Sequence, residues 1–456
     1  MDELTLDVII LDLLKNKEIK KLRSMLDDNN PIDIAAALSD MITEETITRE
    51  QLLVVYRILS KETAAEVFVE MSSEVQQDLI SAFTDKELHE VLDELFLDDT
   101  VDIIEEMPAT VVKRMLRNVD PDTRKSINQL LNYPEDSAGS IMTIEYVDLK
   151  KDMTVEESFA RIRATGVDKE TIYTCYVTDR NRKLLGMLSV KDLLLAKYED
   201  IVGDIMEENV ISVTTTDDQE SVARMFSKYD FIALPVVDGE NRLVGIITVD
   251  DAIDVMQEEV TEDIEKMAAI RPSEKPYMRM GVWDLFKIRI PWLLLLMISA
   301  TFTGMIIRNY EDALSVYAVL TAFLPMLMDT GGNSGSQASV TIIRGLSLGE
   351  IELSDLPRVI WKEIRVAVLC GISLSAVSFL KLMFFDRVGA TVALIVSLTM
   401  ACTILVAKTV GCILPMFSKK IGLDPAVMSS PFITTIVDAL SLVIYFNIAN
   451  SLLHFA

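Results

Sequence analysis

The sequence predicts a multidomain protein: an all-α superhelical N-terminal domain, then an α/β tandem repeat, then an α-helical membrane domain of five spans. Three observations support this fold class. Short helical patterns recur at spacings of 10 to 14 residues in the first part, two segments of the middle part align without gaps, and long apolar runs fill the last part. A chain of 456 residues has room for two or three such domains.

Charge divides the chain into two halves of different character. The net charge is −28; residues 1–280 carry 31 basic and 60 acidic side chains, whereas residues 281–456 carry 12 basic and 11 acidic ones. An acidic soluble half therefore precedes a nearly neutral membrane half. The acidic surface argues against nucleic acid as a partner and suits divalent cations, which reduce the repulsion among carboxylates.

The composition also restricts the chemistry. The chain has two histidines, His89 and His454, and its four cysteines show no metal-ligand spacing. We therefore expect no zinc site, no disulfide framework and no histidine-based catalysis, and we predict that the protein is not an enzyme. Carboxylates and backbone carbonyls remain, and these are ligands for hard cations. The N-terminus lacks the basic region typical of a signal peptide.

Residues 1–135 predict a superhelix of short stacked helices. Six times an apolar residue directly precedes a residue that caps or starts a helix. These pairs are Leu59–Ser60, Met71–Ser72, Phe83–Thr84, Leu97–Asp98, Met107–Pro108 and Val119–Asp120. Asp98 and Asp102 lie one turn apart at a predicted helix start, where the helix dipole alone also favours acidic side chains.

Residues 137–199 and 200–255 predict two copies of one α/β unit. Residues 177–194 align without gaps with residues 236–253, and an Ile-Met pair, ending in Met142 or Met206, opens each copy. Each copy contains the pattern Gly-apolar-apolar-Ser/Thr-x-x-Asp, beginning at Gly186 and at Gly245. This pattern resembles a tandem pair of cystathionine-β-synthase (CBS) domains, which are regulatory modules.

The CBS resemblance implies a regulatory nucleotide site. In that family the hydroxyl and the Asp of the motif often meet the ribose and phosphates of an adenine nucleotide, which here singles out Ser189 with Asp192 and Thr248 with Asp251. ATP is thus a candidate regulatory ligand. Residues 1–255 contain no Walker A loop and no kinase signature, so we do not expect ATP hydrolysis.

Residues 252–280 predict a connecting helix and a linker. One face of the helix is apolar, and acidic side chains occupy much of the rest. A helix of this kind could dock against a pore mouth and be moved by the CBS pair; the alternative is a helix packed on its own domain.

Residues 281–456 predict a membrane domain. Basic residues concentrate before the first span and in the loops after the second and fourth spans, which places the N-terminal half in the cytoplasm and the C-terminus outside. The five predicted spans cover about residues 289–307, 314–345, 358–384, 388–417 and 427–454.

Two features of this region predict an ion path. Glycines and Pro325 within Leu324–Gln337 predict an interrupted second span, with Asn333 and Gln337 one turn apart to hold a hydrated ion; small-residue helix packing is the alternative. The role of Asp329 stays open. Asp438 lies amid apolar, Thr and Ser neighbours, so it either binds an ion in a pore or bonds to a neighbouring helix, for example through Lys408.

Together the acidic helical domain, the CBS pair, the acidic connecting helix, the five spans and the segments PMLMDTGGNSGSQAS and PFITTIVDA resemble the MgtE family of magnesium channels. The resemblance implies a homodimer in membrane lipid with its pore on the two-fold axis. It assigns Asp438 to the pore, Asp424 to the cytoplasmic mouth, and residues 252–270 to a plug helix. The implied magnesium-binding acids are Asp98, Asp102, Asp218, Asp230, Asp251, Asp254, Glu259, Glu262 and Asp263.

We therefore expect a magnesium-selective channel or transporter of the cell membrane that is gated by cytoplasmic Mg²⁺. Two alternatives stay open: a secondary transporter of another divalent cation such as Mn²⁺ or Co²⁺, and a membrane-bound metal or nucleotide sensor that transports nothing.

Overall fold

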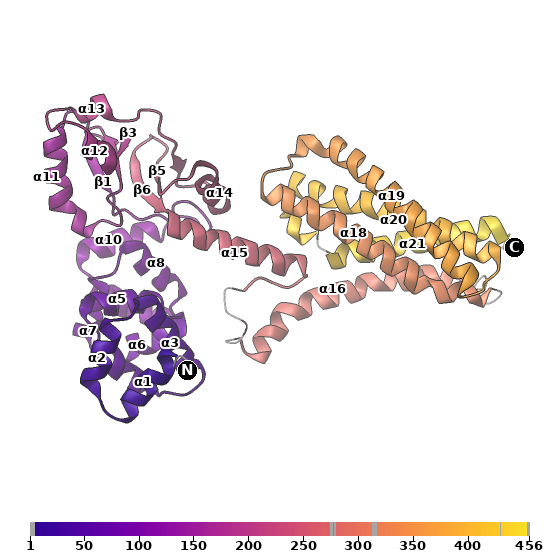
Figure 1. The fold of residues 1–456 in the computed structure, drawn as a ribbon, viewed down its shortest axis with the longest axis horizontal. Helices are drawn as coiled ribbons and strands as arrows, with labels where there is room; N and C mark the ends of the chain where they lie inside the picture. The colour runs from indigo at the N-terminus through magenta and orange to yellow at the C-terminus, as the bar shows by residue number, and fades with distance from the viewer. Residues whose placement is uncertain (1–4, 274–276, 278–279, 312–316, 429, 454–456) are drawn as a thin grey trace. The chain divides into compact units, whose positions relative to one another are not determined.

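The computed structural model describes residues 5–273, 277, 280–311, 317–428 and 430–453 (Figure 1). The chain forms two compact units, Met1–Met256 and Gln257–Ala456, each described by itself below. Parts of the predicted linker and of the predicted beginning of the second span lie outside the described residues.

The first unit begins with short helices, as the capping pattern predicts. Ser60, Thr84 and Asp120 each stand at an N-cap and accept a hydrogen bond from a backbone N–H of the following turn. Asp98 lies in the first turn of its helix, as a helix-starting residue would, while Phe96 is the N-cap. The helices are α1 (Leu6–Lys15), α2 (Ile19–Asp27), α3 (Pro31–Thr43), α4 (Arg49–Tyr56), α5 (Lys61–Val69), α6 (Ser73–Ala82), α7 (Asp85–Leu92), α8 (Leu97–Glu106), α9 (Ala109–Asn118) and α10 (Pro121–Leu130).

The predicted duplication is present as two three-stranded sheets, in the orders β1-β2-β3 and β4-β5-β6. In both sheets the first pair is parallel, the second pair is antiparallel, and the register shifts at equivalent positions, after Val177 and after Val236. The elements are β1 (Val147–Lys150), α11 (Val155–Thr165), η1 (Gly166–Asp168), β2 (Thr174–Thr178), β3 (Leu184–Ser189), α12 (Val190–Leu195), α13 (Val202–Ile205), β4 (Val213–Thr214), α14 (Gln219–Tyr229), β5 (Ala233–Val237), β6 (Leu243–Thr248) and α15 (Val249–Met267).

The motif glycines explain how the two copies join. The segment that opens each copy crosses to the other copy, where Thr143 bridges to Ile246 of β6 and Glu207 bridges to Met187 of β3. A Cβ at Gly245 would lie 2.6 Å from Met142 Sδ, and a Cβ at Gly186 would lie 2.7 Å from Met206 Sδ. Glycine is therefore required where the crossing segment passes over the strand.

The core of the first unit joins its helical part to the second copy. One continuous cluster of buried apolar side chains runs from Ile10 through Phe68 and Met115 to Leu234 and Val255. Burial of this surface stabilises the superhelix and the second copy together. The position of α8 relative to the sheets is thereby defined.

The second unit consists of long helices. Among the described residues, four helical segments are long and apolar enough to cross a membrane: Val282–Asn309, Leu353–Phe384, Ala390–Lys420 and Ser430–Leu453. The helix Leu324–Ser347 is also long, but it carries more glycine and polar residues and is not among these four. The elements are α16 (Val282–Asn309), η3 (Ala318–Phe323), α18 (Leu324–Ser347), η4 (Leu353–Asp355), α19 (Leu356–Phe384), α20 (Ala390–Lys420), η5 (Pro425–Val427) and α21 (Ser430–Leu453).

The expected interruption of the second span is wrong, because α18 is a continuous α-helix. Its glycines serve close packing instead. A Cβ at Gly331 would lie 2.6 Å from Thr403 Cγ2 of α20, and a Cβ at Gly335 would lie 3.0 Å from Ile433 of α21. Small residues let helices approach closely in a membrane, where packing has to replace the hydrophobic effect.

We expect Gly411→Ala to destabilise the second unit by roughly 1 to 3 kcal/mol, because its Cβ would overlap the backbone carbonyl oxygen of Gly335, which cannot rotate away. Thermal unfolding of the detergent-solubilised protein measures the effect. Gly304→Ala is the matched control, since nothing lies within 4 Å of a Cβ there. Equal melting temperatures for the two variants would contradict the packing role.

Candidate cation-binding sites

The first site lies where α8 approaches the segments that precede β1 and β2. Asp98 of α8, Glu145 and Glu170 each offer one carboxylate oxygen, and these three oxygens lie within 4.8 Å of one another. Asp98 is only 9% exposed. Three residues distant in the sequence thus form a compact group of carboxylates, which we call the acidic cluster.

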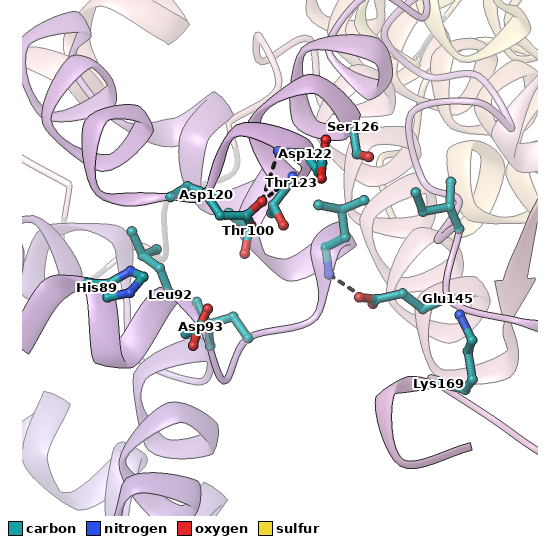
Figure 2. A pocket seen from close by; sticks show the side chains of 14 residues that line it. His89, Leu92, Asp93, Thr100, Asp120, Asp122, Thr123, Ser126, Glu145 and Lys169 are labelled. Atoms are coloured by element: carbon teal, nitrogen blue, oxygen red, sulfur yellow. Dashed lines mark hydrogen bonds between the residues drawn. The ribbon is translucent and has the colours of Figure 1, made fainter. Parts of the chain in front are cut away.

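Glu145 reaches the cluster because it caps α8. The N-cap residue Phe96 has no side-chain acceptor, and the Leu97 N–H donates instead to Glu145 Oε2 at 3.1 Å (Figure 2). The positive end of the helix dipole also favours a carboxylate at this place. A capping interaction between distant segments therefore brings Glu145 close to Asp98.

The carboxylates of this region destabilise one another's ionised forms. Burial, and then repulsion from neighbouring carboxylates, raises the pKa of Asp98 well above its usual value. The same two causes raise the pKa of Asp99 and of Glu170 to about 7, and burial raises the pKa of Asp251 to about 6. A bound cation would relieve this repulsion.

The acidic cluster fits a hard divalent cation. Glu170 Oε2 is buried and has no hydrogen-bond partner among the described residues. Cis and trans ligands of an octahedral Mg²⁺ stand about 3 and about 4 Å apart, given metal–oxygen bonds of about 2.1 Å. Small side-chain rotations, or bridging waters, would bring the cluster to that spacing.

A cavity of about 310 Å³ borders the cluster (Figure 2). Glu145 lines it, so ions can reach one side of the cluster through this space. Asp93, Asp120 and Asp122 line it as well, together with the basic residue Lys169.

The structure brings together only some of the acids that the sequence singled out. Asp251 repels Asp98, and burial raises the pKa of Asp254. Asp102 lies one turn beyond Asp98 in α8.

Two further predicted acids lie at the two ends of one helix. Asp218 is the N-cap of α14 and accepts from Ser221 N at 3.0 Å, and Asp230 closes the same helix in a left-handed conformation. Among the described residues, neither belongs to the three-carboxylate group. Conversely, the sequence did not indicate Glu145 and Glu170, because no spacing pattern links them to α8.

The residues predicted to bind a nucleotide form hydrogen bonds with each other in this structure. The Ser189 hydroxyl donates to Asp192 at 2.6 Å at the start of α12, and the Thr248 hydroxyl donates to Asp251 at the start of α15. Each pair is a helix cap that uses only the Oδ2 oxygen of its Asp.

The second site lies in the membrane unit at Asp438 of α21. Its Oδ1 is buried without a hydrogen-bond partner among the described residues, and Asp329 of α18 lies close enough to repel it. The alternative partner Lys408 pairs with Glu363 at 3.9 Å instead. Asp438 thus has one buried carboxylate oxygen available to an ion.

Asn333 and Gln337 share one face of α18 with Asp329. All three are exposed, whereas Gly331 and Gly335 face the neighbouring helices. The spacing of four residues places the three polar side chains in a row along the helix. We call this row the polar stripe.

The third site is at Asp424, just before η5. Lys266, near the end of α15, donates to Asp424 Oδ2 at 2.6 Å and pairs with Glu262 at 2.5 Å. Asp263 accepts from the Ser347 hydroxyl at 3.1 Å. Glu259 also belongs to this half of the helix. Of the predicted plug residues, Asp263 therefore contacts the end of α18, and Glu262 lies near Asp424 through their shared partner Lys266.

The fold combines helices that are long and apolar enough to cross a membrane with a CBS pair and an acidic helical domain. Family models agree: residues 324–448 match a divalent cation transporter (MgtE), residues 29–136 match the MgtE intracellular N domain, and residues 138–199 and 202–258 match CBS domains.

Two magnesium transporters named MgtE are similar to this chain over nearly its whole length. The magnesium transporter MgtE of Thermus thermophilus is 37% identical over 98% of both chains, and that of Bacillus subtilis is 34% identical over 99% of this chain and 98% of its own. The solved cytosolic domain of the Mg²⁺ channel MgtE in complex with ATP is 40% identical over 55% of this chain and its full length, with a TM-score of 0.51. The chain belongs to the MgtE family of magnesium transporters, which is not a family of enzymes.

The raised pKa values predict a pH-dependent stability of α8. Asp99 of α8 and the neighbouring Glu170 take up more protons in the folded than in the unfolded state between pH about 4 and about 7, so without metal the stabilisation is complete at low pH and is lost as pH rises through about 7. In EDTA we expect hydrogen exchange of α8 amides to report a loss of roughly 2 to 4 kcal/mol over this range. Glu170→Gln should flatten the dependence; an unchanged slope in that variant would contradict the assignment.

Proposed function

We propose that the protein is a magnesium-selective channel of the cell membrane that closes when cytoplasmic Mg²⁺ binds to its acidic soluble region. The observation that supports this most directly is Asp438, whose carboxylate oxygen Oδ1 is buried without a hydrogen-bond partner among the described residues, inside a bundle of apolar helices. A charged group at such a place is costly and is kept where it meets an ion or water.

The polar stripe supports a pore between two copies of the chain. Asp329, Asn333 and Gln337 are exposed on a single chain, and they would be unfavourable against lipid. In a homodimer with α18 beside the two-fold axis they would line a water-filled path. The two Asp438 carboxylates would then share one ion, and Mg²⁺ would compensate their repulsion better than a monovalent ion would.

Mg²⁺ loses water reluctantly, so few direct ligands are needed along this path. Amide and carboxylate side chains such as Asn333 and Asp438 can hold the hydrated ion through its waters. Asp424 would be the last carboxylate before the cytoplasm.

In this proposal, repulsion among carboxylates of the first unit controls whether the channel is open or closed. When cytoplasmic Mg²⁺ is low, repulsion among Asp98, Glu145, Glu170 and Asp251 favours separation of α8 from the CBS pair. When Mg²⁺ is high, the ion binds the compact form more tightly and shifts the population towards it. The acidic face of α15 would transmit this change to the pore. This reading places the first unit in the cytoplasm and the C-terminus outside.

ATP is a second regulatory ligand in this proposal, supported by the ATP complex of the related cytosolic domain. Binding would engage the pair Ser189 and Asp192 or the pair Thr248 and Asp251. Since Asp251 also repels Asp98, ATP at the second motif would alter the acidic cluster.

A second candidate is a carrier for several divalent cations, which the family description, a divalent cation transporter, favours. Flux assays with Mn²⁺, Co²⁺ and Mg²⁺ distinguish the two candidates, because only the second predicts transport of all three ions. A protein that passes none of these ions would instead be a sensor.

We expect Asp438→Asn to lower Mg²⁺ flux into proteoliposomes at least about tenfold, because the amide cannot supply the charge that compensates the ion. Asp329→Asn should weaken the apparent Mg²⁺ affinity by a smaller factor, since Asp329 acts on the ion beside Asp438. The control is Asp386→Asn, whose carboxylate pairs with Lys381 at the end of α19. If Asp438→Asn carries Mg²⁺ at the wild-type rate, Asp438 does not bind the ion in the pore.

We expect Glu145→Gln to raise the cytoplasmic Mg²⁺ concentration that half-closes the channel by about three- to tenfold, because one ligand charge is lost from the acidic cluster. Flux at low cytoplasmic Mg²⁺ should stay at the wild-type level. Glu74→Gln, a substitution in the first turn of α6, is the control. A closing midpoint that does not move would show that the cluster is not the sensor.

A further inference from the structure

Lys266 connects the end of α15 to the cytoplasmic mouth carboxylate. Its Nζ lies 2.6 Å from Asp424 Oδ2 and 2.5 Å from Glu262 Oε1, and its side chain is 21% exposed. Burial opposes the charge of Lys266, but the hydrogen bonds to Asp424 and Glu262 outweigh it and raise its pKa. The ammonium group therefore stays charged between two carboxylates.

The two oxygens of Asp424 have separate roles. Oδ1 accepts from Ala426 N at 2.8 Å and starts η5, which fixes the orientation of the carboxylate. Oδ2 points to Lys266. The oxygen that could serve an ion at the mouth is thus occupied by a cation belonging to the chain.

The surrounding contacts fix the same end of α15. Asp263 accepts from Ser347 at the end of α18, and Glu265 accepts from Ser273 N at 2.9 Å. Without Lys266, docking would bring Glu262 next to Asp424 with no positive charge between them. A docked helix in this arrangement needs a cation at this point.

We propose that Lys266 is that cation: it takes the place of a metal ion between Glu262 and Asp424, so that α15 can dock at the mouth without metal at this point. The inference rests on the proposed function, because it concerns the gate of that channel. An ammonium group carries one charge against two carboxylates, so the balance is incomplete. A divalent cation would compete with the lysine for the same oxygens.

Removing the positive charge of Lys266 should change how α15 docks. In Lys266→Gln the docked state would depend on a divalent cation bridging Glu262 and Asp424. In Lys266→Arg the positive charge remains, and docking without metal should persist.

A disulfide reporter tests the docking directly and needs no transport. In a background in which the native cysteines are replaced, Asp263→Cys and Ser347→Cys place two thiols where a hydrogen bond now joins α15 to α18. The rate of oxidation to the cross-link in the full chain reports how often the helix is docked. The measurement is made in EDTA and again with Mg²⁺.

We expect Lys266→Gln to slow cross-linking in EDTA on the order of three- to tenfold, the size expected for a partly exposed ion pair with two partners. Added Mg²⁺ should restore the rate, which also demonstrates that the variant is folded, and Lys266→Arg should match the parent protein. Equal rates for the glutamine variant and its parent in EDTA would overturn the proposal, and so would an arginine variant as slow as the glutamine one.

Flux adds the functional consequence. At low cytoplasmic Mg²⁺, Lys266→Gln should conduct three- to tenfold more than the wild type, with a matching upward shift of the closing midpoint, because docking has become metal-dependent. If the wild type conducts no ion, the proposed function fails while the cross-link result still decides the role of Lys266. If the wild type conducts and the variant does not differ from it, the role of Lys266 fails while the channel stands.

Discussion

Repulsion between carboxylates that lie close together without metal ions determines how both units of this protein behave. In the first unit burial, together with this repulsion, raises the pKa of Asp99 and Glu170 to about 7, so these groups are only partly ionised near neutral pH. In the membrane unit it acts between Asp329 and Asp438. Such an arrangement stores free energy that a divalent cation releases on binding, which couples ion concentration to structure.

Close helix packing decides which side chains remain available for ions. The glycines of α18 face α20 and α21, and this leaves Asp329, Asn333 and Gln337 on the opposite, exposed side. The same sequence feature that predicted a broken helix therefore has a different physical role. Glycine weakens an isolated helix, but among tightly packed neighbours the close approach that it permits outweighs the lost propensity.

The sequence predicts the order of domains, the duplication and the isolated carboxylate Asp438, because each depends on local pattern or on burial of a charge in an apolar run. It fails at Glu145 and Glu170, which join Asp98 only through tertiary packing and a cap that α8 receives from a distant segment. It correctly indicates a helix start at Asp98, which lies in the first turn of α8, but the Leu-Asp pair does not identify the N-cap, which is Phe96. Long-range proximity leaves no spacing pattern in the sequence.

The crossing of the two CBS copies has a consequence for how this region folds and evolves. Because Thr143, next to Met142, bridges to β6 of the second copy, and Glu207, next to Met206, bridges to β3 of the first, each copy is covered by the opening segment of the other. Loss of one copy would leave the other with an open strand edge and an exposed core. The pair can therefore be inherited, exchanged or deleted only as a whole, although its sequence reads as two modules.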